Sequence, residues 1–304
     1  MERNSMTLEK EAFLVKKKAL NSSNNPDNTR TVDQLLESID DENPEVRKLV
    51  IEALGETDDP RAIQKLNEVI VSVENFTVCE RQLAKESLVK IGNPALEYLI
   101  TLLEDRNKDV NIRIRVAVAL GSFDASRAVS TLISILNDGT ENSTVRRYAS
   151  HALGNIGDQL AVKPLIDLLR GETGKGVPII LQISAAGALG KIGGKHAIEA
   201  LIAALGDDNI GIQEQSLNSL QLLGTVPIGP LISFLHQEKS ITGDSNHLFN
   251  ALKALAAITP PPLSQESMKQ LKTLEPLFLS LILEPSADNR SRKMLKTLLS
   301  RIVK

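Results

Sequence analysis

The feature that most constrains this chain is an internal repeat with a period close to 33 residues. A short anchor, Ala or Ser followed by Leu and often by Gly, occurs seven times, at Ala53-Leu54-Gly55, Ser87-Leu88, Ala119-Leu120-Gly121, Ala152-Leu153-Gly154, Ala188-Leu189-Gly190, Ser219-Leu220 and Ala254-Leu255. Successive anchor leucines are 34, 32, 33, 36, 31 and 35 residues apart. Repeats of about 20 to 50 residues are typical of solenoids and other repeat arrays rather than of one globular core.

Each copy of the repeat contains two segments with the periodicity of an amphipathic helix. In the fourth copy, Val145, Ala149, Ala152 and Ile156 lie on one helical face, and Gly157 ends the segment. The second segment, 160–171, is again leucine-rich. Because neither helix can bury its apolar face alone, the pairs must stack on their neighbours. We therefore predict an all-α chain, an α-solenoid of about seven helix pairs with helical N- and C-terminal caps.

The repeats resemble HEAT repeats over about 31–258. The segment 145–169 reads VRRYASHALGNIGDQLAVKPLIDLL. It is similar to the short HEAT-like subtype first named for phycobilisome lyases, whose consensus is close to VRxxAAxALGxIGDxxAVxPLIxLL. The resemblance implies that the first helix of each pair lines the concave surface of the solenoid.

Composition agrees with close-packed helices. Six Phe, two Tyr and no Trp make the chain 3% aromatic, whereas sheets are enriched in aromatic and β-branched residues. We divide the chain into an N-terminal helix and polar linker at 1–30, the repeat solenoid at 31–258, and C-terminal capping helices at 259–304, where three prolines follow Thr259. We expect the capping helices over about 264–283 and 287–303.

Charge and motifs exclude several classes of function. Lys and Arg number 35 and Asp and Glu 38, for a net charge of −3, so the chain lacks the basic character of nucleic-acid-binding proteins. No apolar run is long enough for a membrane span, no leader is recognisable, and Cys79 is the one cysteine, so we expect a cytoplasmic protein. The four histidines lack metal-ligand spacing, so we predict no metal site. No motif identifies catalytic residues.

The resemblance also predicts a structural ladder of arginines, seven residues before the anchor leucines. Its members, the arginine ladder, are Arg47, Arg81, Arg113 and Arg146. In HEAT proteins such an arginine pairs with an aspartate of the preceding turn, and Asp41, Asp105, Asp138 and Asp207 stand in those turns. The last three copies carry Gln182, Gln213 and Leu248 at the ladder position, so we expect these copies to be less regular.

If the first helices line the working surface, their exposed stripe falls six and two residues before each anchor leucine and two residues after it. In the third and fifth repeats the first helix has apolar residues at these positions, and in the fourth repeat, which lies between them, it has polar residues there. An apolar floor with a central cation suits a partner helix or a flat ligand that carries carboxylates. The alternative is that Ile114 and Ile183 only contact neighbouring helices. The predicted groove consists of Glu86, Lys90, Ile114, Val118, Arg147, His151, Asn155, Ile183 and Lys191.

Two classes of function remain. The resemblance points to the E/F-type phycobilin lyases and related chaperone-like proteins of the phycobilisome. These bind a phycobiliprotein subunit and assist the covalent attachment of a linear tetrapyrrole to one of its cysteines. The tetrapyrrole is then a substrate, and no cofactor is expected. The alternative is a non-catalytic scaffold or adaptor that binds another protein through its concave face.

The expected position of the groove residues on the inner face, taken together with the resemblance, suggests roles for them in a lyase, although no family motif marks these residues individually. Arg147 and Lys191 would pair with the bilin propionates. Glu86 or His151 would contact the pyrrole nitrogens or move a proton. The apolar residues that would pack on the rings are Ile114, Val118 and Ile183. Whether the chain acts alone or with a second HEAT-repeat chain is left open by the sequence.

Overall fold

The computed structural model describes residues 28–72, 74–123, 126–173, 176–237, 245–259, 265–283 and 289–302. The expected N-terminal helix lies outside these ranges. Within them the regular structure is entirely helical, which confirms the all-α prediction. The chain divides into two compact units, Met1–Leu132 and Ile133–Lys304, with the division inside helix α8. The expected boundaries of the repeat solenoid, after residues 30 and 258, stay a prediction.

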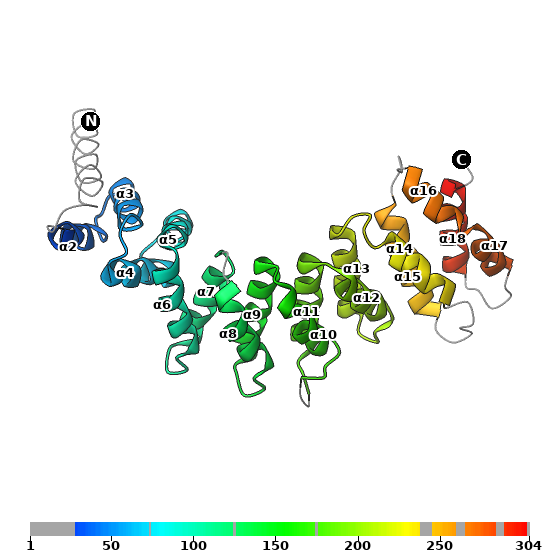
Figure 1. Cartoon of the computed structure of the whole chain (residues 1–304), viewed down its shortest axis with the longest axis horizontal. Coiled ribbons are helices and arrows are strands. Elements are labelled where there is room, and N and C mark those ends of the chain that lie inside the picture. Colours follow the sequence, from blue (N-terminus) through cyan, green and yellow to red (C-terminus); the bar gives the residue numbers. More distant parts are fainter. Residues whose placement is uncertain are drawn as a thin grey trace. The chain divides into compact units, whose positions relative to one another are not determined.

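The first unit is a stack of helix pairs. Its helices are α2 (Asn28–Ser38), α3 (Pro44–Leu54), α4 (Pro60–Val71), α5 (Val78–Ile91), α6 (Asn93–Glu104), α7 (Val110–Leu120) and the start of α8 (Ser126–Asn137). Helices α3 and α5 pack side by side in one layer, and α4 and α6 pack side by side in the other (Figure 1). Each layer buries its apolar face against the other, as in HEAT repeats.

The second unit continues the same scheme. Its helices are α9 (Ser143–Ile156), the 3-10 turn η1 (Gln159–Ala161), α10 (Val162–Leu169), α11 (Ile179–Ile192), α12 (Lys195–Ala203), η2 (Ala204–Gly206), α13 (Ile210–Leu222), α14 (Ile228–Gln237), α15 (Ser245–Ile258), α16 (Gln265–Lys272), α17 (Glu275–Leu283) and α18 (Asn289–Ile302). The first helices α9, α11, α13 and α15 pack in sequence, as do the second helices α10, α12 and α14. This unit is by itself an α-solenoid.

The anchors form the core of the helix pairs. All seven anchor leucines are buried. The small residues Ser87, Ala188 and Ser219 lie against the anchor glycine of the preceding first helix. A Cβ on Gly55 would lie 2.7 Å from Ser87 Cβ, and one on Gly154 would lie 2.8 Å from Ala188 Cα. Ser87 Oγ also donates a hydrogen bond to the Ile51 carbonyl at 3.1 Å. Helices at this separation leave little room for aromatic rings.

The C-terminal helices differ from the sequence expectation in one respect. We expected one helix over about 264–283, but the structure has α16 and α17, separated by a turn in which Leu274 N donates to Leu271 O. Pro276 stands in the first turn of α17. Proline has no amide hydrogen and disfavours helical geometry at the residue before it, so it starts a helix more readily than it continues one.

Candidate functional site

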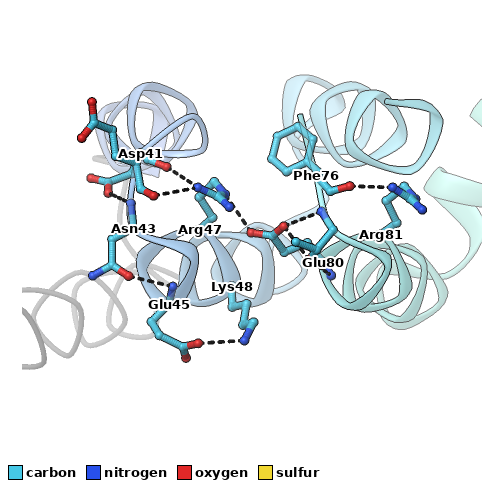
Figure 2. Close-up of polar contacts among 10 residues, drawn as sticks. Asp41, Asn43, Glu45, Arg47, Lys48, Phe76, Glu80 and Arg81 are labelled. Carbon is cyan, nitrogen blue, oxygen red and sulfur yellow. Dashed lines mark hydrogen bonds and ion pairs between the residues drawn. The ribbon is translucent and has the colours of Figure 1, made fainter. Parts of the chain in front are cut away.

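Arg47, the first member of the arginine ladder, joins three elements of the first unit (Figure 2). Its Nη1 donates to the carbonyls of Asp41 and Glu42 at 2.7 and 3.1 Å, in the turn before its own helix. Its Nε donates to Glu80 Oε1 of the next first helix at 2.7 Å. The carboxylate that bridges neighbouring repeats is therefore Glu80, and Asp41 contributes its main chain.

Glu80 is fully buried and has a second task at the start of α5. Its Oε2 accepts hydrogen bonds from Thr77 N and Thr77 Oγ1, both at 2.7 Å, while Thr77 Oγ1 caps Glu80 N, which makes a capping box. Burial alone would raise the pKa of Glu80, but the hydrogen bonds from Arg47 and Thr77 and the charge of Arg47 lower it below the ordinary value. The sequence signal was present, since Thr77 and Glu80 have the spacing of a capping box.

The other ladder arginines bind main-chain carbonyls. Arg81 Nη1 donates to Phe76 O at 2.5 Å. Arg113 Nε donates to Leu103 O, and Arg146 Nε to Leu136 O, both at 2.9 Å. Leu103 and Leu136 lie in the last turns of α6 and α8, whose carbonyls have no partner within the helix. Arg113 and Arg146 therefore cap the second helix of the preceding pair, whereas Arg81 binds the turn before its own helix.

At Arg47 the carboxylate partner is Glu80 rather than the expected turn aspartate Asp41, and all four turn aspartates make local hydrogen bonds. Each accepts a hydrogen bond from the amide two residues later in its own turn. The donors are Asn43 N for Asp41, Asn107 N for Asp105, Thr140 N for Asp138 and Asn209 N for Asp207, at 2.7 to 3.0 Å. Such Asx turns shape the connection between pairs locally.

The capping of second helices continues after the last arginine of the ladder. Gln182 Nε2 donates to Leu169 O of α10 at 3.0 Å. Gln213 Nε2 instead donates at 2.5 Å to Asp207 O, in the turn before its own helix. His247 Nε2 lies 3.1 Å from Ile202 O. The carbonyls of Leu103, Leu136, Leu169 and Ile202 are spaced by 33 residues and all have a side-chain partner. The later repeats therefore keep this contact with amide or imidazole groups in place of guanidinium.

Four residues of the predicted groove lie in the first unit. On α5, Lys90 forms an ion pair with Glu56 in the turn after α3, and Glu86 Oε1 accepts from Gln82 Nε2 at 2.8 Å. On α7, Ile114 is half-buried and Val118 is 40% exposed. Among the described contacts, no hydrogen bond or ion pair joins the α5 residues to the α7 residues.

The other five groove residues lie in the second unit, and the structure brings four of them together. Arg147, His151 and Asn155 follow one another at four-residue spacing on α9. Lys191 of α11 donates from Nζ to Asn155 Oδ1 at 2.7 Å, so the same repeat position on two neighbouring helices meets. Arg147 Cζ lies 4.9 Å from the ring centre of Tyr148, whose ring is 5.9 Å from that of His151.

Ile183 contacts the next first helix. Its Cδ1 lies 2.9 Å from the position that a Cβ on Gly211 would take, which agrees with the alternative that this side chain packs on a neighbour. It is nevertheless half-buried rather than buried. The binding role of the predicted groove stays a prediction.

The electrostatic character of the α9–α11 surface is positive. We call Arg147, His151 and Lys191 the cationic cluster. Burial lowers the pKa of His151 below its ordinary value, and the charges of Lys191 and Arg147 lower it further. Neither Arg147 nor Lys191 has a carboxylate partner within the described residues. Arg147 and Lys191 can therefore bind an anionic group, and His151 in its neutral form can accept a proton.

The described ranges contain neither a metal-binding group of side chains nor a membrane span. No group of three or more His, Cys, Asp or Glu side chains there is placed to hold a metal ion. No helix of that part of the chain is both long and apolar enough to cross a membrane.

Sequence profiles of two repeat types match this chain. The profile of HEAT repeats matches 6–78 and 96–180, just over half of the chain. The profile of the PBS lyase HEAT-like repeat matches 181–207. No curated sequence matches significantly.

Solved structures with similar folds share little sequence with this chain. An engineered protein is 17% identical, with 97% of this chain and 96% of that chain covered and a TM-score of 0.39. Kap121p is 15% identical over 89% of this chain and 33% of its own, with a TM-score of 0.49. The complex of CpcE and CpcF of phycocyanin lyase from Nostoc sp. PCC7120 is 18% identical over 81% and 94%, with a TM-score of 0.36. Scores this low carry no conclusion about function.

Proposed function

Because this chain belongs to the HEAT-repeat family, we propose that it binds another protein through the exposed face of its first helices, with the cationic cluster on α9 and α11 as the centre of recognition. The single observation that carries the proposal is the absence of a counter-charge. Arg147 and Lys191 have no carboxylate partner in the described residues, and His151 lies half-buried between them.

Several other cations of the described residues have a carboxylate partner. Arg47 pairs with Glu80, Arg61 with Asp33 and Arg127 with Glu97. Like charges that are left unpaired repel one another, so a cluster of this kind is most stable with an anionic group bound. The partner is therefore a protein surface that presents carboxylates beside an apolar residue, which would contact the half-buried Ile183.

A second candidate is a role like that of the phycobilin lyases, in which the chain binds a phycobiliprotein subunit and assists attachment of a linear tetrapyrrole. The observation that favours it is that the lyase-type repeat at 181–207 is the one that supplies Ile183 and Lys191. Arg147 and Lys191 would bind the bilin propionates, and Ile183 would pack on a ring.

The chemistry of attachment needs positioning and a proton acceptor rather than a nucleophile from this chain. The thiol of the substrate cysteine adds across a bilin carbon–carbon double bond: sulfur bonds to one carbon, and a proton goes to the other. His151, neutral because its pKa is lowered, would accept the thiol proton and return it to the bilin. No metal or redox partner enters this balance.

The protein-binding proposal is tested with the variants Arg147→Glu and Lys191→Glu. Proteins that co-purify with the wild-type chain from its own cells should be lost with both variants and kept with Lys163→Glu, whose side chain is 85% exposed on α10. Partners that bind the wild type and the α9–α11 variants equally would show that the surface is wrong.

The lyase proposal has its own test. The chain is co-expressed with a phycobiliprotein subunit and with phycocyanobilin or phycoerythrobilin. A covalent, fluorescent adduct should form, and His151→Gln should reduce its rate about 10²-fold or more if the imidazole moves the proton. A subunit as colourless as that of a control without this chain would rule the role out.

A further inference from the structure

A cavity of about 410 Å³ opens between α13, α15 and the start of α18 in the second unit. It is separate from the cationic cluster. Its apolar floor is formed by Leu217, which is 8% exposed, and by the half-buried Phe249. Ile210 stands at the rim and is 67% exposed. An exposed isoleucine beside a cavity marks a surface where apolar contact with a ligand is favourable.

The walls of this cavity carry opposite charges. Asp208 and Glu214 line the α13 side, and Lys253 of α15 and Arg290 of α18 line the other. Asp208, Glu214 and Lys253 make no hydrogen bond or ion pair with any residue that the structure describes. The carboxylates of Asp208 and Glu214 and the ammonium group of Lys253 therefore line one cavity without forming an ion pair across it.

The amides that line the cavity are already engaged. Asn250 Nδ2 donates to Leu205 O and to Gln213 Oε1, both at 3.0 Å. Gln213 Nε2 donates to Asp207 O at 2.5 Å. These bonds hold α15 against α13 and fix the spacing of the walls. Polar recognition of a ligand is therefore left to the charged side chains.

The chemistry of the ligand follows from the charges and their separation. A simple anion or cation would satisfy one wall and leave the other unpaired. The two walls stand on neighbouring stacked helices, whose axes lie about 8 to 10 Å apart, so a ligand that carries its two charges on separate side chains can contact both. Charged side chains two residues apart on an extended peptide are separated by about 7 Å at the backbone and can reach both walls.

We propose that this cavity binds an extended peptide segment of a partner protein that carries a basic and an acidic side chain two residues apart. Both side chains lie on the same face of the segment, so the basic one pairs with Asp208 and Glu214, the acidic one pairs with Lys253, and their aliphatic stems pack against Phe249 and Leu217. This inference does not depend on a partner at the cationic cluster.

Blocked tripeptides test the proposal on the full-length chain with labelled isoleucine and leucine methyl groups. Ac-Lys-Leu-Glu-NH2 should shift the methyl resonances of Ile210 and Leu217 saturably. Ac-Lys-Leu-Lys-NH2 and Ac-Glu-Leu-Glu-NH2, which carry one sign only, should bind about 2- to 5-fold more weakly, as expected for the loss of one exposed ion pair. Equal binding of all three peptides, or no shift at either residue, would overturn the proposal.

Two exposed residues link the effect to the walls. With Glu214→Gln, replacing the peptide lysine by glutamine should matter less than in the wild type, because Asp208 is then the one carboxylate left on that wall. With Lys253→Gln, replacing the peptide glutamate should no longer matter. Glu199→Gln and Lys163→Gln, exposed on the second helices α12 and α10, are matched controls and should keep the wild-type pattern. If the Glu214 and Lys253 variants also keep that pattern, the peptide does not bind between these walls.

Discussion

Arg47 and Glu80 show how one ion pair at the residue scale connects two neighbouring helix pairs. Arg47 binds the turn before α3 and the carboxylate on α5, while Glu80 also closes the capping box of its own helix. Because Glu80 is fully buried, removing its charge leaves the Arg47 guanidinium without a counter-charge, and an amide in its place cannot accept from both Arg47 Nε and Thr77 N. The pair therefore fixes the geometry of the first unit at its most buried charged position.

Glu80→Gln should lower the stability of the first unit by about 1.5 to 3 kcal/mol at pH 7. The folded-state pKa of Glu80 is lowered, so the unfolded state binds its proton at higher pH. The advantage of the wild type should thus be complete above the ordinary glutamate pKa of 4.5 and should vanish as the pH falls through the folded-state pKa. Urea unfolding at several pH values measures it. Glu86→Gln, at an exposed site on α5, is the control, and an equal loss there would contradict the prediction.

His151 provides a second prediction at this scale. Removing the neighbouring charge with Lys191→Gln should raise the pKa of His151 towards its ordinary value of 6.5, because the protonated ring is then repelled less. Titration of the imidazole resonance by NMR measures the change. Lys163→Gln, on α10, should leave the titration as it is. A pKa that does not move in Lys191→Gln would mean that burial and Arg147 depress it without Lys191.

At the scale of the element, the closest approach between first helices decides which side chains the anchors can carry. Gly154 lies against the main chain of Ala188, where a Cβ would come within 2.8 Å of Cα and 3.0 Å of Cβ. Main-chain atoms of a packed helix cannot move aside as a flexible side chain can. The glycine at this anchor therefore permits the contact between α9 and α11.

Gly154→Ala should destabilise the second unit by about 1 to 3 kcal/mol, although alanine favours a helix over glycine by about 1 kcal/mol. Thermal or urea unfolding measures the loss. Gly139→Ala is the matched control, since no atom lies within 4 Å of a Cβ there and its φ is not positive. That variant should be neutral or slightly stabilising. Equal behaviour of the two variants would show that the helices can separate at no cost.

The elements were predictable to the extent that they depend on local patterns. The anchors and the paired helices follow from spacing along the chain, and Thr77 with Glu80 could have been recognised as a capping box. The partners of Gln182 and Gln213 could not, because the carbonyl that each amide reaches depends on the path of the preceding turn. The positions of His151 and Lys191 on one surface followed from the repeat register, but the lowered pKa depends on burial.

At the scale of the whole molecule, each unit is a row of pairs that contact chiefly their neighbours. In such an array the stability is approximately a sum of terms for each repeat and for each interface between repeats. A local change then affects the repeats on either side of it more than distant ones. The arginines and glutamines that cap second helices are among these interface terms, since each joins one pair to the pair before it.

Hydrogen exchange should reveal this locality directly. Glu80→Gln should lower amide protection in α3 to α6 by about 10-fold or more and leave α11 to α13 close to the wild type, because a loss of about 1.4 kcal/mol corresponds to a factor of ten. Gly154→Ala should show the reverse, with protection lost in α9 to α13 and kept in α3 to α6. The two variants control for each other, since both remove buried interactions of similar size. If either variant lowered protection equally in both units, the chain would unfold as one cooperative block and the nearest-neighbour description would fail.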